Sequence, residues 1–374
     1  MRIGVLRETL PGERRVPLTP EGARLLVGHD HLVVIESGLG AGSGFSDTEY
    51  LAAGAQMAYT SREVAGQAEL LVKVHALRLE EIDLVRPNTT LVAFHHLAGQ
   101  SAAQHEALVQ ARASTVSLEL VREGAEYPIM EPLSAIGGRV AVTLAAWHLT
   151  VLGNGPGILL GGSPGVPPAM VLVIGGGIAG RAAAAEAVAA GAQVVVLDRD
   201  PRQLARLEAQ IGRGVVTAVA SEYHLVRYLE QADVVIGAVA VRGEPAPKVL
   251  RRSHIRAMRE GALLIDMSID EGGCAETSRA TSTENPVYEM EGVRHLCIPN
   301  LPSEVARTAS RALGSSLLPY LDAVAGGLPR ALATSAALRN AVGFLDGRLV
   351  NRALRRFVAQ PYVPLDEIVP IAED

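Results

Sequence analysis

Residues 171–200 read "VLVIGGGIAGRAAAAEAVAAGAQVVVLDRD", a pattern of strand, glycine-rich turn, helix and second strand. A run of aliphatic residues leads into Gly175, Gly177 and Gly180, spaced as GxGxxG, and an alanine-rich helical pattern follows. In a strand–turn–helix unit the first glycine permits a tight turn, and the second lets the backbone approach a pyrophosphate. The third lets the helix pack closely on the strand. Because the start of the helix offers free N–H groups to phosphates, the stretch is predicted to bind a dinucleotide.

An acidic residue, Asp198, ends the strand that follows the helical pattern. A carboxylate at this place can accept hydrogen bonds from both ribose hydroxyls and would repel a 2′-phosphate. This favours NAD over NADP as the cofactor. The neighbouring Arg199 leaves NADP open, because an arginine can pair with that phosphate.

Short β-branched runs alternate with helical patterns along most of the chain. One such helix is predicted at "TPEGARLLV", where Thr19 can cap the first turn and Pro20 occupies the first helical position. Alternation of this kind predicts parallel sheets with helices on both faces. We expect strands at 2–6, 32–36, 70–74, 91–95 and 115–119, and at 171–174, 194–197, 215–219, 234–238, 263–266 and 295–298.

Two long helical patterns, from Ser134 and from Ser303, flank the second set of strands. We therefore predict an α/β protein with two doubly wound, Rossmann-like parallel-sheet domains, in which the NAD domain is inserted into the substrate domain. The predicted limits are 1–133 for the first part of the substrate domain, 134–303 for the NAD domain and 304–374 for the returning part. The Gly/Pro-rich segment 153–168 is expected to be a loop or a domain junction.

The bulk composition excludes several classes of protein. The chain has 374 residues, of which 48% are hydrophobic and 20% charged, so it can fill two cores and does not resemble a disordered protein. A formal net charge of −6 without a basic block argues against a nucleic-acid or membrane partner. Cys274 and Cys297 have no CxxC spacing, so neither a metal site nor a disulfide framework is predicted. A reduced, cytoplasmic protein is expected.

Several polar residues follow predicted strands, and such strand ends form the ligand-binding edge of a doubly wound sheet. Asp270 and Asn300 are expected to converge near the nicotinamide end of the dinucleotide, although Asp270 in a glycine turn has a purely structural alternative. In "LVAFHHL" (91–97), adjacent strand residues point to opposite faces, so at most one of His95 and His96 faces a cleft.

Beyond these features, long motifs across the chain resemble the alanine dehydrogenase and transhydrogenase alpha-chain family. They are "MRIGVLRETLPGERRVPLTPEG", "LGAGSGFSD", "FHHLAG", "GGSPGVPPAMVLVIGGGIAG", "IGAVAVRGEPAPK", "IDMSIDEGGC" and the tail "QPYVPLDEI". With a single catalytic unit and no membrane span, the chain is similar to alanine dehydrogenase rather than to a proton-pumping transhydrogenase. The resemblance also implies a homo-oligomer, a hexamer.

The resemblance assigns roles to residues of this chain. It implies that Arg15 binds the substrate carboxylate, that His96 is the catalytic acid/base and that Asp270 is its acidic partner. A solvated loop is the alternative for the "ERR" run that contains Arg15. His95 is then expected to pack against a helix. The cofactor residues that it implies are Ser134, Gly175, Gly177, Ile178, Ala179, Gly180, Asp198, Val239, Asp270, Arg279 and Asn300.

The departures from the family pattern lie near the substrate. His75 stands where the family usually has a lysine that binds the substrate, so a conditional hydrogen bond replaces a fixed charge. Lys73 is retained nearby and is a second candidate for substrate binding, provided that the strand ends close to it. Leu118, Ala135 and Glu271 replace a tyrosine, an acid and a glutamine of the family.

Three functions remain in competition. The first is an NAD-dependent amino-acid dehydrogenase that interconverts L-alanine, or a related 2-amino acid, with the 2-oxo acid and ammonia. The second is an opine-type dehydrogenase, which joins a 2-oxo acid to an amino-acid amine; the carboxyethyl-ornithine synthases share a similar "PGERRVPL" and also lack the lysine. The third is a non-catalytic NAD-binding regulator, which would have no need to retain Arg15, His96 and Asp270 together.

Overall fold

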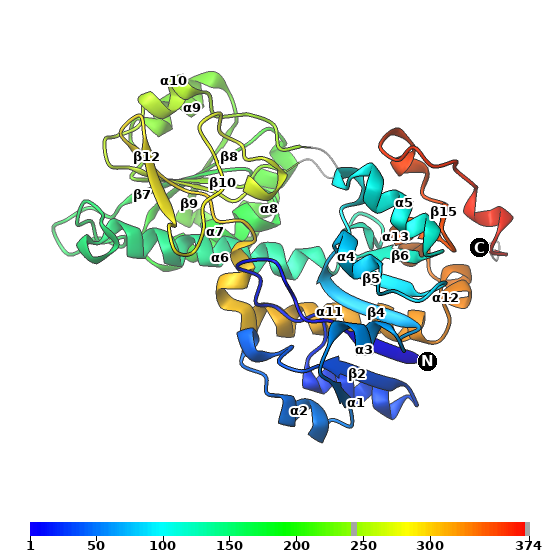
Figure 1. Cartoon of the computed structure of the whole chain (residues 1–374). Coiled ribbons are helices and arrows are strands. Elements are labelled where there is room, and N and C mark those ends of the chain that lie inside the picture. Colours follow the sequence, from blue (N-terminus) through cyan, green and yellow to red (C-terminus); the bar gives the residue numbers. More distant parts are fainter. Residues whose placement is uncertain (241–244, 371–374) are drawn as a thin grey trace. The chain divides into compact units, whose positions relative to one another are not determined.

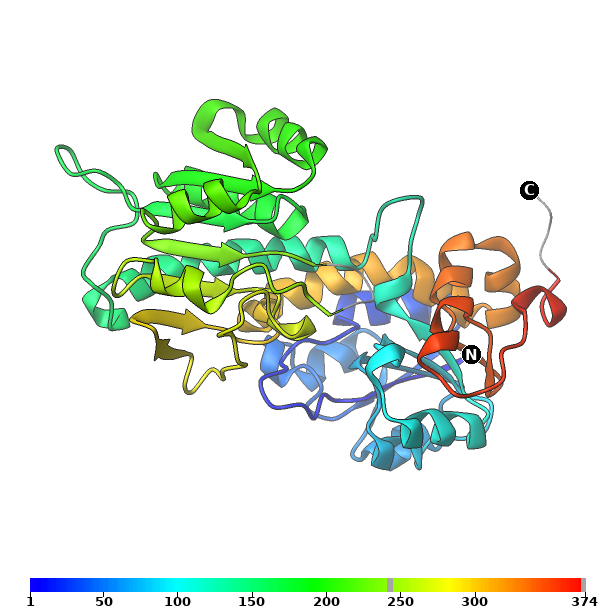
Figure 2. The same cartoon turned by 90° about the horizontal axis from the view of Figure 1, so that it is seen from above.

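The computed structural model describes residues 1–240 and 245–370 and divides into two compact units. Unit 1 comprises Met1–Leu133 and Val305–Asp374, and unit 2 comprises Ser134–Glu304. Each unit contains a parallel or mainly parallel sheet covered by helices (Figures 1 and 2). The predicted fold class, two doubly wound α/β domains with one inserted into the other, is therefore confirmed.

The sheet of unit 1 has the strand order β3-β2-β1-β4-β5-β6, and every pairing is parallel. The order reverses between β1 and β4, so the ends of these two strands form the topological switch point, where such sheets bind ligands. The strands are β1 (Arg2–Val5), β2 (Leu32–Glu36), β3 (Gln56–Ala58), β4 (Leu70–His75), β5 (Thr90–Phe94) and β6 (Ser114–Ser117).

Helices of unit 1 come from both ends of the chain. They are α1 (Pro20–Gly28), α2 (Asp47–Ala52), α3 (Ser61–Ala65), α4 (Leu79–Ile82), α5 (Ala102–Gln110), α11 (Ala306–Ala325), α12 (Leu328–Thr334) and α13 (Ala336–Ala341). A small hairpin, β14 (Phe344–Leu345) and β15 (Arg348–Leu349), follows them. Thr19 caps α1 by accepting a hydrogen bond from the Gly22 N–H at 3.3 Å, and Pro20 opens the helix, as predicted.

The sheet of unit 2 has the order β12-β13-β11-β10-β7-β8-β9 and reverses between β7 and β10. Its pairings are parallel except for the edge strand β12, which runs antiparallel to β13. The strands are β7 (Met170–Ile174), β8 (Gln193–Asp198), β9 (Val215–Val219), β10 (Val234–Gly237), β11 (Leu263–Asp266), β12 (Val287–Met290) and β13 (Val293–Leu296). The helices are α6 (Met130–Leu149), α7 (Ile178–Ala189), α8 (Pro201–Ile211), α9 (Glu222–Leu229) and α10 (Arg252–Arg256).

Alternate residues of the central strands fill two separate cores in unit 2. Val171 and Val173 of β7 pack into one cluster, whereas Leu172 and Ile174 pack into the other. Because both faces are buried, the strands read as continuous aliphatic runs rather than as an apolar–polar alternation. These continuous aliphatic runs are the reason that the strands could be predicted from the sequence.

The limits of several elements differ from the prediction. α6 begins at Met130 rather than Ser134, because the first turn of a helix tolerates Pro132, whose missing N–H would have no partner there. A 3-10 turn, Leu301–Val305, precedes α11, which begins at Ala306 rather than Ser303. The short edge strands β3 and β12 were not predicted. No helix in residues 1–240 and 245–370 is long and apolar enough to cross a membrane.

Candidate functional site

The glycine-rich turn of unit 2 joins β7 to α7, and two of its glycines are required by packing. Gly175 has φ +105°, and a Cβ there would lie 2.3 Å from the carbonyl oxygen of Ala238, the residue directly after β10. A Cβ on Gly180 would lie 1.8 Å from the Gly175 carbonyl oxygen. Both positions therefore exclude any side chain, and this allows α7 to start directly against the sheet.

Gly177, unlike Gly175 and Gly180, has no close neighbour at the position of a Cβ atom. It is the N-cap of α7, and a Cβ built on it would meet no heavy atom of the described chain within 4 Å. The space in front of the first turn of α7 is thus open, and its N–H groups and positive dipole end are suited to a phosphate. Ile178 and Ala179 form that first turn.

Asp198, at the end of β8, lies against this turn. Its carboxylate accepts hydrogen bonds from the Gly176 N–H at 2.5 Å and from the Asp200 N–H at 2.7 Å. The acid that the sequence placed after the next strand is therefore adjacent to the glycine-rich turn. Arg199 is exposed.

The other predicted cofactor residues of unit 2 lie mainly on loops after strands. Val239 follows β10, and its N–H and C=O both bond to the Ser268 hydroxyl, at 3.1 and 2.7 Å. Arg279 lies over the Tyr288 ring at 4.3 Å. Ser134 lies in α6. Residues 241–244, the "VRGE" of the motif "IGAVAVRGEPAPK", fall outside the described part of the chain.

Asp270 and Asn300 lie side by side, as expected. The Asn300 N–H donates to the two Asp270 carboxylate oxygens at 3.0 and 3.1 Å. Sequence reasoning missed the residue that fixes this loop, the buried Asp266 at the end of β11. Asp266 accepts hydrogen bonds from the backbone of Ser268 and Cys274 at 3.0 and 2.8 Å. The sequence feature that could have indicated Asp266 is an acidic residue at the end of a buried aliphatic strand.

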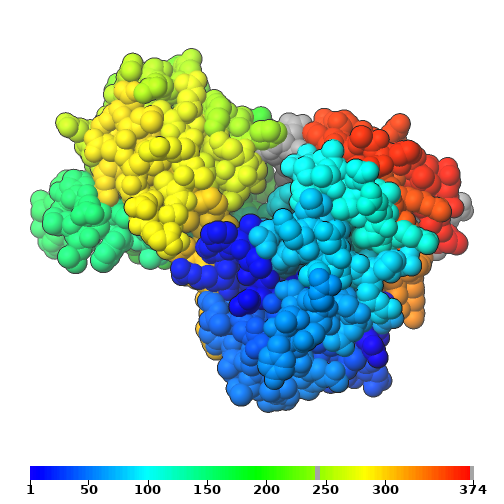
Figure 3. Space-filling view, viewed as in Figure 1, coloured from blue at the N-terminus to red at the C-terminus, as the bar shows by residue number. Residues whose placement is uncertain are grey.

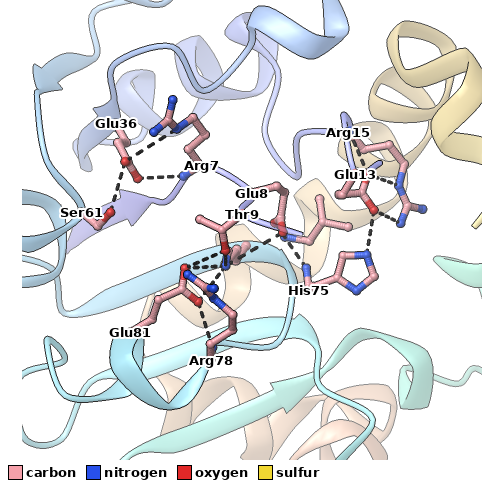
Figure 4. A network of polar contacts seen from close by, with 12 residues as sticks. Arg7, Glu8, Thr9, Glu13, Arg15, Glu36, Ser61, His75, Arg78 and Glu81 are labelled. Atoms are coloured by element: carbon pink, nitrogen blue, oxygen red, sulfur yellow. Dashed lines mark hydrogen bonds and ion pairs between the residues drawn. The ribbon is translucent and has the colours of Figure 1, made fainter. Parts of the chain in front are cut away.

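In unit 1, Arg15 and His75 are joined through Glu13 (Figure 4). The Arg15 guanidinium donates from Nε to Oε1 of Glu13 at 2.9 Å and from Nη2 to Oε2 at 2.8 Å. Nε2 of His75 lies 2.7 Å from the same Oε2. The Arg15 side chain is buried, so the alternative of a solvated "ERR" loop does not describe it.

The electrostatics of Glu13 follow from these contacts. Burial of the carboxyl, whose side chain is 2% exposed, acts to raise its pKa. The hydrogen bonds from His75 and Arg15 outweigh burial and hold the pKa of Glu13 below its ordinary value. Glu13 is therefore an ionised acceptor for both partners.

Lys73 lies deeper in the unit. Its side chain is 1% exposed, and its ammonium lies 2.8 Å from each carboxylate oxygen of Glu81 and 4.0 Å from Oε2 of Glu8. The register of β4 against β5 shifts between Val72 and His75, so simple alternation does not hold at this end of the strand.

Glu8, which sequence reasoning did not single out, connects the segment after β1 to the end of β4. Its Oε1 accepts hydrogen bonds from the Val74 N–H at 2.6 Å and the His75 N–H at 3.3 Å. Burial raises the pKa of Glu8 to about 7, although Lys73 and His75 act to lower it. Glu8 thus changes charge near neutral pH at the switch point of this sheet.

The two neighbouring histidines have different surroundings. β5 ends at Phe94, so both lie beyond the strand, and His96 adopts the left-handed conformation with φ 46°. His95 is buried with Nε2 3.1 Å from the Leu91 carbonyl oxygen, and burial lowers its pKa to about 4. The His96 side chain is exposed. The expected division into one packed and one accessible histidine is confirmed, but the turn after β5 produces it rather than strand alternation.

Glu119 holds His96 in this conformation. The Glu119 carboxylate accepts a hydrogen bond from the His96 N–H at 2.8 Å, and burial raises the pKa of this carboxyl. A non-glycine residue at positive φ is strained, and such strain persists only where neighbouring groups enforce it. No motif or spacing in the sequence indicated this contact.

The sheet of unit 2 and its glycine-rich turn together place the protein in the Rossmann-like fold class. Comparisons with known proteins identify the family. Residues 4–137 match the model described as alanine dehydrogenase/PNT, N-terminal domain, and residues 141–352 match the corresponding C-terminal domain. The chain belongs to the alanine dehydrogenase/PNT family.

Individual relatives cover nearly the whole chain. An alanine dehydrogenase of Methanococcus maripaludis is 36% identical over 98% of this chain and 99% of its own length. The alanine dehydrogenase of Bacillus subtilis is 34% identical over 98% of this chain and 97% of its own length. A solved structure of an L-alanine dehydrogenase is 36% identical, covers 96% of this chain and 99% of its own, and gives a TM-score of 0.90. A transhydrogenase from Sinorhizobium meliloti, 24% identical with a TM-score of 0.80, shares the fold.

Proposed function

We propose that this protein is an NAD-dependent oxidoreductase acting on CH–NH2 donors, which converts L-alanine to pyruvate and ammonia and catalyses the reverse reductive amination. One observation carries the proposal: the chain retains Arg15, His96 and Asp270 along with the glycine-rich turn, and its relatives named alanine dehydrogenase match it over nearly its full length. Neither an opine-type reaction nor a purely regulatory role is favoured by these relatives.

The residues of unit 2 fit a dinucleotide. The open space in front of Gly177 and the first turn of α7 would receive the pyrophosphate, and the Asp198 carboxylate would accept the ribose hydroxyls. Bound NAD would accept the hydride from the substrate carbon. Because a carboxylate repels a 2′-phosphate, Asp198 supports NAD rather than NADP. Val239, Arg279, Asn300 and Ser134 are proposed as further contacts.

The residues of unit 1 would hold the small substrate. Glu13 occupies the Nε/Nη2 edge of Arg15, so a substrate carboxylate would meet the remaining Nη1 side of the fork. His96 would take a proton from the water that attacks the imine carbon and return it as ammonia leaves. Asp270 is proposed as the acidic partner in this reaction. Lys73 is proposed only as an indirect contributor, because Glu81 already binds its ammonium.

The test is NADH consumption followed by absorbance. Pyruvate plus ammonium should suffice. A requirement for an added amino acid would indicate an opine-type enzyme, and inertness under all conditions would indicate a regulator. His96→Ala should abolish turnover while NADH still binds, because His96 lies in unit 1 and the glycine-rich turn lies in unit 2. Full activity of this variant would exclude His96 as the acid/base.

Self-association, proposed as a hexamer, has support in an exposed apolar arm. The arm, residues 150–168, projects from unit 2 (Figures 2 and 3) and exposes Val151, Leu152, Leu159 and Val166. Exposed apolar patches commonly mark interfaces. Light scattering of the wild type and of Val151→Lys/Leu152→Lys tests this, and a monomeric wild type would exclude it. A cytoplasmic location is also proposed, in line with the free thiols of Cys274 and Cys297.

A further inference from the structure

A guanidinium outside the GxGxxG spacing holds the glycine-rich turn of unit 2. Nη1 of Arg181, the fourth residue of α7, donates to the Gly176 carbonyl oxygen at 3.1 Å and to Oε1 of Gln203 in α8 at 2.8 Å. The N–H of the same Gly176 donates to the Asp198 carboxylate at 2.5 Å. Both polar backbone groups of Gly176 are therefore held, one by the end of β8 and the other by α7 and α8.

The contact at the Gly176 carbonyl sets the direction of the next N–H along the chain. The described residues contain no cis peptide bond, and in a trans peptide the C=O of one residue and the N–H of the next point in opposite directions. The Gly177 N–H therefore points away from the Arg181 guanidinium. It makes no hydrogen bond within residues 1–240 and 245–370, and it belongs to the N-cap beside the open space in front of α7. This N–H is a donor available to an anion.

The charge of Arg181 also favours an anion at this place. The side chain is half-buried, its two acceptors are neutral oxygens, and it forms no ion pair within the described part of the chain. Its guanidinium reaches back to the start of α7, although the dipole of a helix disfavours a cation at that end. An anion in front of α7 would offset this unfavourable interaction, whereas the neutral acceptors do not.

We propose that Arg181 is a positioning residue for the pyrophosphate of the dinucleotide. Through the Gly176 carbonyl it fixes the peptide whose other polar group, the Gly177 N–H, would donate to a phosphate oxygen. Gln203 contributes indirectly, because its amide oxygen fixes the guanidinium. The proposal rests on the proposed function and adds these two side chains to its cofactor site. Without them the peptide can rotate, and its N–H would be aimed at the phosphate for only part of the time.

The experiment compares the Kd of ADP, which carries a pyrophosphate, with that of adenosine, which carries none, both by competition with NADH fluorescence. Arg181→Met should weaken ADP and NADH about ten- to hundredfold and leave adenosine nearly unchanged, since a hydrogen bond to a charged group is lost. Gln203→Met should weaken ADP less, by about three- to tenfold. It should have no further effect in the Arg181→Met background, because both side chains act through one peptide. Arg206→Met, at an exposed arginine of α8, controls for loss of positive charge and should keep the wild-type affinities.

Three results would overturn the proposal. The first is unchanged ADP affinity in Arg181→Met. The second is equal weakening of ADP and adenosine with a lower Tm of the ligand-free protein, which would give Arg181 a role in stability alone. The third is full ADP affinity in Gln203→Met together with a loss in Arg181→Met, which would indicate direct contact between Arg181 and the phosphate.

Two further measurements keep the test decisive. If Arg181→Met does not fold, ADP against adenosine in Gln203→Met still decides the matter, because only a positioning role makes this variant selective against ADP. Failure of the proposed function would look different, since the wild type would then bind NADH and ADP without turning over pyruvate and ammonium.

Discussion

Alanine substitution at Gly180 and at Gly177 should separate the packing role of the glycine-rich turn from its ligand role. A methyl group on Gly180 would lie 1.8 Å from the Gly175 carbonyl oxygen and 2.9 Å from its carbonyl carbon. Both are backbone atoms of a residue at φ +105°, so neither can move aside as a side chain would. The overpacking cost should be near the upper end of its usual range, about 3 kcal/mol.

Alanine has the higher helix propensity, which returns about 1 kcal/mol. The net loss for Gly180→Ala is then about 2 kcal/mol, which lowers the Tm of a domain of this size by about 4–8 °C. Gly177→Ala places its methyl in open space at φ −65°, and its cost as an N-cap should stay below about 1 kcal/mol. It should instead weaken NADH binding by about tenfold or more, because the methyl occupies the approach to the pyrophosphate.

The assays are thermal unfolding without NADH and a fluorescence titration with NADH, both on each variant. Gly180→Ala should show the larger fall in Tm, and Gly177→Ala should bind NADH weakly with a nearly unchanged Tm. An unchanged Tm for Gly180→Ala would refute the packing argument. Wild-type NADH affinity in Gly177→Ala would refute the placement of the pyrophosphate.

Three other changes have defined outcomes. The pKa of Glu8 is raised from 4.5 to about 7, so the proton bound to Glu8 stabilises the folded state at low pH, and this contribution is lost as the pH rises through 7. The free energy of unfolding of Glu8→Gln, measured by urea denaturation, should equal that of the wild type at about pH 4. Above about pH 8 it should exceed the wild-type value by about 3 kcal/mol. An equal difference at both pH values would contradict this. Lys73→Met should cost about 3–5 kcal/mol in the same assay, because Glu81 is left charged and buried, and Lys73→Met/Glu81→Leu should recover most of it; no recovery would contradict the pairing. Asp198→Asn should weaken NADH more than NADPH in parallel titrations, and an unchanged ratio of the two Kd values would count against its role at the ribose.

The residues that were foreseen and those that were missed differ in one respect. Gly175, Gly180 and Asp198 belong to one continuous strand–turn–helix–strand segment, whose constraints are local and leave a readable spacing. Glu8, Glu13 and Glu119 act on residues far along the chain, at His75 and His96. Carboxylates with such distant partners are indistinguishable in sequence from ordinary surface acids.

Periodicity and short motifs were enough to predict the two sheets, their aliphatic cores, the dinucleotide turn and the family. Only the tertiary structure decided that Lys73 is enclosed by Glu81, that the irregular end of β4 leaves His75 facing Glu13, and that Glu119 holds His96 beyond β5. The physical reason is that burial and hydrogen-bond partners set the charge and direction of a polar side chain, and folding brings those partners from distant parts of the chain.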